Sequence, residues 1–258
     1  MFFQTVTDIL RQYYPILLRG IGNTMLIALV GTVFGLLIGL LTGILRTVPP
    51  SRSRFVHFLQ KSASVLISIY VEVFRGTPMM VQAMVIFWGF AFANGGQTLP
   101  LVPAGIFIVS INTGAYMTEI VRGGIISIDK GQFEGASAVG MSHWQAMVHV
   151  VLPQVMRNIL PSISNEFVIN IKDTSVLNVI GVAELYYMGG KIQRMNLKIF
   201  ETYAIVCIAY FILTFTITRL LRLAEQKLEG KGTYVICGSQ SDPAAEIRIH
   251  IEEEVPHD

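Results

Sequence analysis

The sequence predicts an all-α, polytopic membrane protein with about five transmembrane helices. Hydrophobic residues make up 52% of its 258 residues and charged residues only 14%, whereas a soluble domain carries about 25% charged residues. Apolar runs of about 20 residues recur along the chain, and a helix of that length crosses the hydrocarbon core of a bilayer. Because these runs are continuous, they argue against the alternating pattern of barrel strands.

Five apolar stretches are long enough to span a membrane. We expect them at about residues 21–45, 55–93, 101–121, 158–180 and 203–221. The second stretch is too long for one straight span, and Pro78, with Gly76 before it, predicts either one broken helix or two short ones. In the first stretch, glycine at every fourth position removes side chains from one helix face, which predicts a packing seam for another helix. These glycines are Gly31, Gly35, Gly39 and Gly43.

Basic residues set the expected orientation of the spans. The stretch 46–61 contains four Lys or Arg residues and no acidic residue, and short loops of this kind remain in the cytoplasm. The first span therefore runs from outside to inside, so the loop after the third span and the C-terminus are expected to be cytoplasmic. Lys191, Arg194 and Lys198 on the expected outer side strain this rule, but the balance of basic residues still favours it.

Ionisable residues within a span are costly, so they usually line a pathway or pair with each other. Glu72 and Arg75, three residues apart near the expected break, can form a structural ion pair or face a solute. Thr77 lies beside them and is a further candidate for solute binding. By contrast, Glu119 and Arg122 at the end of the third span are expected to anchor the following loop.

The fourth span carries four more candidates for solute binding, which are Glu166, Asn170, Lys172 and Asp173. Glu166 and Asp173 lie two turns apart on one helix face, while Lys172 points about 100° away. Lys172 can hold a substrate carboxylate, and Asp173 or Glu166 an ammonium or guanidinium group. Neutralisation of these charges between helices is the alternative interpretation.

Motifs for nucleotide, metal or covalent chemistry are absent from the sequence. Gly190-Lys191 and Gly230-Lys231 lack both the preceding pattern of a phosphate-binding loop and the hydroxyl residue that follows it. The sequence has no H-E-x-x-H, no Cys/His metal spacing and no G-x-S-x-G. We therefore expect a chain that is not an enzyme, binds no metal and holds no cofactor of its own. Residues 1–20 do not have the pattern of a cleaved signal peptide.

The central segment, residues 131–153, is polar to amphipathic and lies between long apolar runs. It contains Glu134-x-Ala136, then Gly140 six residues after the Glu, and ends in Val150-x-Leu152-Pro153. This pattern resembles the EAA loop in the membrane subunits of ABC importers, although Gly135 stands where Ala is usual and Val150 where Ile is usual.

Three flanking stretches resemble the His/Glu/Gln/Arg/opine branch of that family, which transports polar amino acids. They are residues 74–78 (Phe-Arg-Gly-Thr-Pro), 116–125 (Tyr-Met-Thr-Glu-Ile-Val-Arg-Gly-Gly-Ile) and 171–175 (Ile-Lys-Asp-Thr-Ser). The resemblance covers roughly residues 15–228 and combines several ordered motifs.

The resemblance implies a MetI-like permease subunit of a type I importer in the bacterial inner membrane. Its partners would be a second permease subunit, an extracytoplasmic substrate-binding protein and an ABC ATPase that holds ATP and Mg²⁺. The solute would be a polar amino acid, with glutamine or a basic amino acid favoured. The central segment would carry a cytoplasmic coupling helix that docks on the ATPase through Glu134, Gly135, Ala136, Gly140, Trp144, Leu152 and Pro153.

Two alternatives stay open. The amphipathic part of the central segment, with Trp144, Met147, Val148 and Val151 on one face, also fits a helix lying on the membrane surface. An ion-driven secondary transporter is the other functional class, and it predicts inverted repeats with a broken helix in each half. We expect residues 1–228 to form the permease domain and residues 229–258 a polar, disordered tail.

Overall fold

The computed structural model describes residues 2–51, 53–229, 234–236 and 247–249. This part of the chain is helical apart from two short strands, β1 (Tyr234–Ile236) and β2 (Ile247–Ile249), which pair antiparallel. The first four helices are α1 (Phe2–Leu45), α2 (Arg54–Gly76), α3 (Met79–Ala93) and α4 (Leu101–Ile126). Then follow α5 (Lys130–Ala138), α6 (His143–Ala146), the π-helix η1 (Met147–Val151), α7 (Leu152–Asp173), the 3-10 helix η2 (Thr174–Ile180), α8 (Leu185–Asn196) and α9 (Ile199–Glu229).

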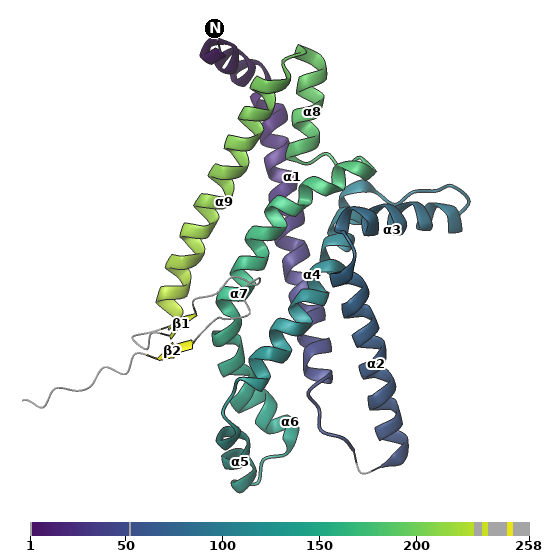
Figure 1. Cartoon of the computed structure of the whole chain (residues 1–258), viewed down its shortest axis with the longest axis vertical. Coiled ribbons are helices and arrows are strands. Elements are labelled where there is room, and N and C mark those ends of the chain that lie inside the picture. Colours follow the sequence, from purple (N-terminus) through teal and green to yellow (C-terminus); the bar gives the residue numbers. More distant parts are fainter. Residues whose placement is uncertain (1, 52, 230–233, 237–246, 250–258) are drawn as a thin grey trace, which may run out of the picture.

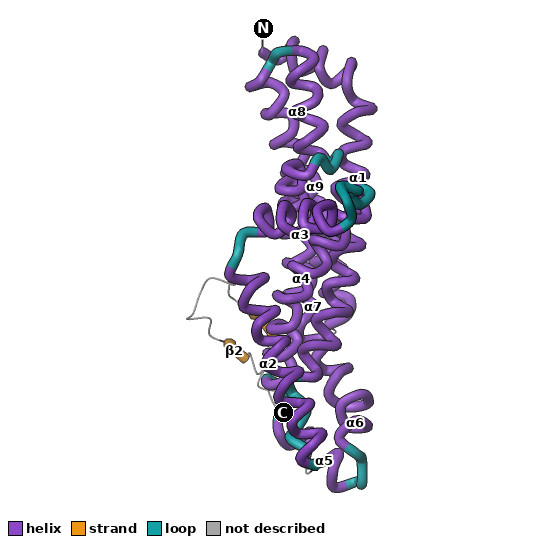
Figure 2. The backbone as a smooth tube through the Cα atoms, turned by 90° about the vertical axis from the view of Figure 1, so that its right-hand side faces the viewer, coloured by secondary structure: helices purple, strands orange, loops and turns teal. Residues whose placement is uncertain are grey.

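The long helices run side by side, while α5 and α6 form one end of the elongated molecule (Figure 1) and α8 lies near the other end (Figure 2). Among the described residues, α1, α4 and α9 are long and apolar enough to cross a membrane. The bent pair of α2 and α3 is a fourth candidate. α7 packs against α1, α4 and α9 but is less apolar, because it carries Arg157, Glu166, Lys172 and Asp173. The five predicted spans therefore correspond to α1, α2 with α3, α4, α7 with η2, and α9.

The packing seam predicted in the first span is confirmed. Four glycines of α1 face four residues of α4, and both sets recur at every fourth position. The pairs are Gly31 with Val109, Gly35 with Thr113, Gly39 with Met117 and Gly43 with Val121. A Cβ atom on any of these glycines would lie between 2.3 and 2.8 Å from an α4 side-chain atom. The missing side chains therefore permit the close approach of the two helices.

The predicted break in the second stretch is also confirmed. α2 ends at Gly76, α3 begins at Met79, and the two helix axes form an angle of 114°. Pro78 precedes the first residue of α3, where its missing N–H costs nothing in helical hydrogen bonds. α3 consequently lies across the long helices instead of continuing α2 (Figure 1).

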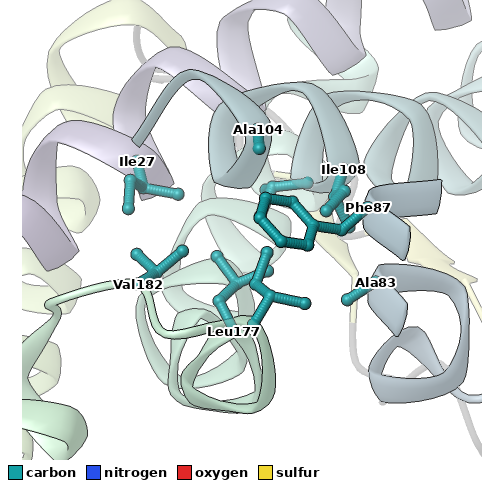
Figure 3. Packing of buried hydrophobic residues seen from close by; sticks show 9 residues of the cluster. Ile27, Ala83, Phe87, Ala104, Ile108, Leu177 and Val182 are labelled. Atoms are coloured by element: carbon teal, nitrogen blue, oxygen red, sulfur yellow. The ribbon is translucent and has the colours of Figure 1, made fainter. Parts of the chain in front are cut away.

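A buried apolar cluster holds α3 in this position (Figure 3). Phe87 of α3 packs with Ile27 of α1, Ile108 of α4, and Leu177 and Val182 in and after η2. All five side chains are buried, so the cluster ties the bend to three other parts of the fold.

Glu184 fixes the start of α8 and lies outside the candidate spans. Its fully buried carboxylate accepts hydrogen bonds from the Tyr186 and Tyr187 N–H groups at 2.9 and 2.7 Å and from the Tyr210 hydroxyl at 2.6 Å. Burial raises the pKa of the Glu184 carboxyl, and these hydrogen bonds offset part of that rise. The carboxylate therefore joins α8 to α9.

The prediction of a disordered tail at residues 229–258 falls mostly outside the described residues. The described exceptions are the end of α9 and the β1–β2 pair, in which Tyr234 is opposite Ile249.

Candidate functional site

The central segment folds into two short helices joined by a tight turn. Asp129 caps α5 and accepts a hydrogen bond from the Gly131 N–H at 2.6 Å. Gly140 has φ +82°, a left-handed conformation that disfavours other residues, and it produces the sharp turn between α5 and α6. Ser142 and Gln145 then form a reciprocal capping box at the start of α6.

The amphipathic face predicted from Trp144 to Val151 is divided in the structure. Met147 and Val151 are buried in a cluster with Val121 and Val155 and so attach the central segment to α4 and α7. Trp144 and Val148 point away from that cluster and are 56% and 49% exposed. Met147, Val148 and Val151 lie in the π-helix η1, which widens the helical turn and so changes the face on which later side chains lie.

The predicted docking residues do not all lie on the surface. Glu134, Gly135, Gly140, Trp144 and Pro153 are exposed. Leu152 is half-buried, whereas Ala136 is buried within the segment and contributes to its packing. Val139 and Met141 flank the Gly140 turn and add two exposed apolar side chains. The result is a small apolar surface around the turn, at the end of the molecule that holds α5 and α6 (Figure 1).

A cavity of about 250 Å³ lies beside the bend between α2 and α3. Four of the seven residues predicted for solute binding line it, and these are Thr77, Glu166, Asn170 and Asp173. Asn112, Tyr116, Pro78, Met79 and Ile169 complete the lining. The bend and α7 thus bring two carboxyl groups, two amides and a phenol to one cavity.

Gln82 and Asn112 satisfy backbone groups freed by the bend. The Gln82 amide donates to the carbonyl oxygens of Phe74 and Thr77, both at 2.9 Å, and to the Thr77 hydroxyl at 2.8 Å. Asn112 of α4 donates to the Gln82 side-chain oxygen at 2.8 Å. This network holds one wall of the cavity, because unsatisfied carbonyls at membrane depth would be costly.

Asn170 links three helices. Its amide donates to the Thr32 hydroxyl of α1 at 2.8 Å and its oxygen accepts from the Thr113 hydroxyl of α4 at 3.1 Å. Glu166, one turn earlier on α7, is also buried, with 3% of its surface exposed. Both side chains are therefore in fixed positions at the cavity wall.

Glu72 and Arg75 lie outside this lining. Both are exposed, and the predicted ion pair between them is not among the two ion pairs of the described residues. The Arg75 guanidinium instead lies over the ring of Tyr116, 5.4 Å from its centroid. Arg75 therefore contacts a residue that lines the cavity without lining the cavity itself.

Lys172 lines a second cavity of about 310 Å³ between α7 and α9. This separation from Asp173 agrees with the rotation of about 100° between successive residues of a helix. Arg219 and Arg222 of α9 line the same cavity.

Glu119 was expected to anchor the loop after the third span, but its ion pairs are made with α4 itself and with the residue after α1. Its carboxylate pairs with Arg46, which follows α1, and with Arg122 at 2.8 Å. It therefore ties the end of α1 to α4, close to the central segment.

Comparison with known proteins identifies the family. The model of the family "Binding-protein-dependent transport system inner membrane component" matches residues 55–230. The chain belongs to this family. The glutamine transport system permease protein GlnP of Escherichia coli K12 is 36% identical over 215 residues, which cover 83% of this chain and 94% of GlnP. The L-cystine transport system permease protein TcyB of Bacillus subtilis is 34% identical over 224 residues, covering 86% and 91%.

A solved structure supports the same relationship. The crystal structure of an amino acid ABC transporter with histidines matches with a TM-score of 0.71 and 34% sequence identity, covering 84% of this chain and 96% of that one. The binding-protein-dependent inner membrane component described here therefore has the helical fold of an ABC transporter permease.

Three polar residues that line or support the cavity of this inner membrane component were not predicted from the sequence: Gln82, Asn112 and Tyr116. Gln82 and Asn112 are amides within otherwise apolar stretches, so the reasoning applied to Asn170 would have selected them too. The described residues contain no group of three or more His, Cys, Asp or Glu side chains placed to hold a metal ion.

Proposed function

We propose that the chain is the translocation subunit of an ATP-driven importer for a polar amino acid and that the central segment docks on a separate ATPase. The observation that carries this proposal is the exposed apolar surface around Gly140, on the segment that bears the EAA pattern in a chain of this family. Exposed Trp144, Val139 and Val148 suit a groove on a protein partner better than water. The docking residues are Glu134, Gly135, Ala136, Gly140, Trp144, Leu152 and Pro153, with Ala136 acting through the packing of the segment.

The surface is firmly attached to the spans. Met147 and Val151 pack against α4 and α7, and Glu119 joins the end of α4 to the residue after α1. Displacement of the central segment by an ATPase would therefore move three long helices, which is the rigid-body kind of switching transition. ATP and Mg²⁺ belong to the partner, and the central segment and the C-terminus face the cytoplasm.

The solute occupies the cavity beside the bend. Glu166 and Asp173 suit an ammonium or guanidinium group, and Asn112 and the Tyr116 hydroxyl suit an amide. The relatives named for glutamine and L-cystine support a polar amino acid as solute. A substrate-binding protein outside the membrane and a second permease subunit complete the transporter. An ion-driven secondary transporter is disfavoured, because the family is defined by binding-protein-dependent transport.

Replacement of Gly140 tests the coupling role. Val at φ +82° is strained by about 1–2 kcal/mol or more, so Gly140→Val should distort the docking surface and uncouple ATP hydrolysis from uptake in the reconstituted transporter. Gly123→Val is the matched control, because Gly123 lies in α4 with no atom within 4 Å of its potential Cβ. Normal uptake by the Gly140 variant would reject the coupling role.

Charge-neutral replacements test the solute site. Asp173→Asn and Glu166→Gln should each reduce solute-stimulated ATP hydrolysis about tenfold or more, since hydrogen bonds between charged partners contribute about 1.5–3 kcal/mol. Glu225→Gln is the control, because Glu225 lines neither cavity. Unchanged stimulation in both cavity variants would exclude these carboxylates from the solute site.

A further inference from the structure

The cavity between α7 and α9 is lined by three cations and no carboxylate. Lys172 comes from the last turn of α7, and Arg219 and Arg222 come from the second half of α9. Two aromatic rings, Phe211 and Phe215, form an apolar wall beside them. Its remaining lining residues are Val168, Thr214 and Thr218.

None of these cations belongs to an ion pair of the described residues, although the charge of Lys172 acts on the neighbouring Asp173 carboxyl. Both ion pairs there belong to Glu119. Asp173 is next to Lys172 in sequence but lines the other cavity, and Arg219 lies over the Phe215 ring at 5.0 Å. Basic residues within spans are usually paired, because an uncompensated charge there is costly. Three positive charges around one cavity therefore favour the binding of an anion there.

The two hydroxyl groups that line the cavity are not free to donate to an anion. Thr214 donates to the Tyr210 carbonyl oxygen at 2.9 Å, and Thr218 donates to the Thr214 carbonyl oxygen at 2.6 Å. The donors left to face the cavity are the ammonium of Lys172 and the guanidinium groups of Arg219 and Arg222. Guanidinium forks match the geometry of phosphate oxygens, and an ammonium adds a point charge.

The surroundings of the cavity favour a lipid over a small soluble anion. α9 stands at the edge of the helix bundle next to α7 (Figure 1), and 11% of its most apolar stretch is buried. Phe211, Ile212 and Phe215 are exposed there, next to the cations. An acyl chain can lie along these side chains while a phosphate occupies the cavity. Basic pockets between transmembrane helices bind anionic headgroups in this way.

We propose that the cavity between α7 and α9 binds the phosphate headgroup of an anionic phospholipid and that this lipid fastens α9 to α7. The proposal rests on the membrane orientation given under the proposed function, but it does not depend on the solute or on the ATPase. The lipid phosphate binds among Lys172, Arg219 and Arg222 and offsets part of their positive charge, and the acyl chain covers Phe211 and Phe215.

The test is native mass spectrometry of the transporter purified in detergent, titrated with phosphatidylglycerol or with phosphatidylcholine. Phosphatidylglycerol should bind with preference and raise the melting temperature. Each of the substitutions Lys172→Gln, Arg219→Gln and Arg222→Gln should weaken its binding about fivefold, which corresponds to about 1 kcal/mol per basic residue near an anionic membrane surface. Arg54→Gln is the control, because Arg54 is an exposed cation of α2 that lines neither cavity.

Three results would overturn the proposal. One is equal binding of the two lipids by the unmodified transporter, and another is unchanged phosphatidylglycerol binding in all three variants. The third is an equal rise in melting temperature with glycerol phosphate or glutamate alone, which would make the cavity a site for a free anion or solute. Retained solute-stimulated ATP hydrolysis in variants that lose the lipid would separate this site from the solute cavity.

Discussion

Replacing Gly39 by Ala should destabilise the packing of α1 on α4. A Cβ atom at this position would lie 2.3 Å from the Met117 Cβ atom and 2.7 Å from the Met117 carbonyl carbon. Because one of these atoms belongs to the backbone, rotation of the Met117 side chain cannot remove the overlap, and the helices must move apart. Overpacking costs about 1–3 kcal/mol, while exchange of Gly for Ala within a helix gains about 1 kcal/mol. We expect a net loss of up to about 2 kcal/mol from these two terms.

Gly22→Ala is the matched control for this substitution. Gly22 also lies in α1, but no atom comes within 4 Å of its potential Cβ. It should therefore gain helix propensity without overlap. The assay is the melting temperature of the purified transporter, and for a chain of this size the Gly39 variant should melt about 5 °C below the Gly22 variant. If the Gly39 variant melts at or above the temperature of the Gly22 variant, the seam does not depend on the missing side chains.

Two further predictions concern buried polar groups. Gln82→Leu should lower the melting temperature, because it removes the donor to the Phe74 and Thr77 carbonyl oxygens at a cost of about 1–3 kcal/mol. Met80→Leu, on the exposed side of α3, is the control. Equal melting temperatures of the two variants would contradict this account of the bend. The raised pKa of Glu184 means that the folded state holds its proton more tightly than the unfolded state. Its stabilising contribution is therefore complete below the ordinary Glu pKa of about 4.3 and is lost as the pH rises through the raised value. Melting temperatures measured over this pH range should fall as the pH rises, and Glu184→Gln should make this fall smaller. An equal fall in the variant would assign the pH dependence to another group.

The sequence predicted features that depend on local chain properties. The break between α2 and α3 was predicted from Pro78, which lacks a backbone donor. The turn at Gly140, which tolerates positive φ, and the cap by Asp129, whose carboxylate reaches a free N–H, are local in the same sense. The seam along α1 was predictable for a similar reason, since four glycines at helical spacing leave one face without side chains.

Features that depend on how helices face each other were not predictable from the sequence. The hydrogen bond from Asn112 to Gln82 joins α4 to α3, and a single sequence does not give their relative rotation. The division of the amphipathic face, with Val148 exposed and Val151 buried, follows from the π-turn of η1, which has no signal in the hydrophobic pattern. The placement of Arg219 beside Lys172 likewise depends on where α9 crosses α7.

The two ion pairs of Glu119 affect how α1 and α4 can move. Glu119 forms ion pairs with both Arg46 and Arg122, so the residue that follows α1 is fixed to the last turns of α4. A displacement of α5 and α6 would reach α4 through Met147 and Val151, which are buried in one cluster with Val121. We therefore expect α1 and α4 to move as one unit and α3 to move with them, because the buried Phe87 packs in one cluster with Ile27 and Ile108.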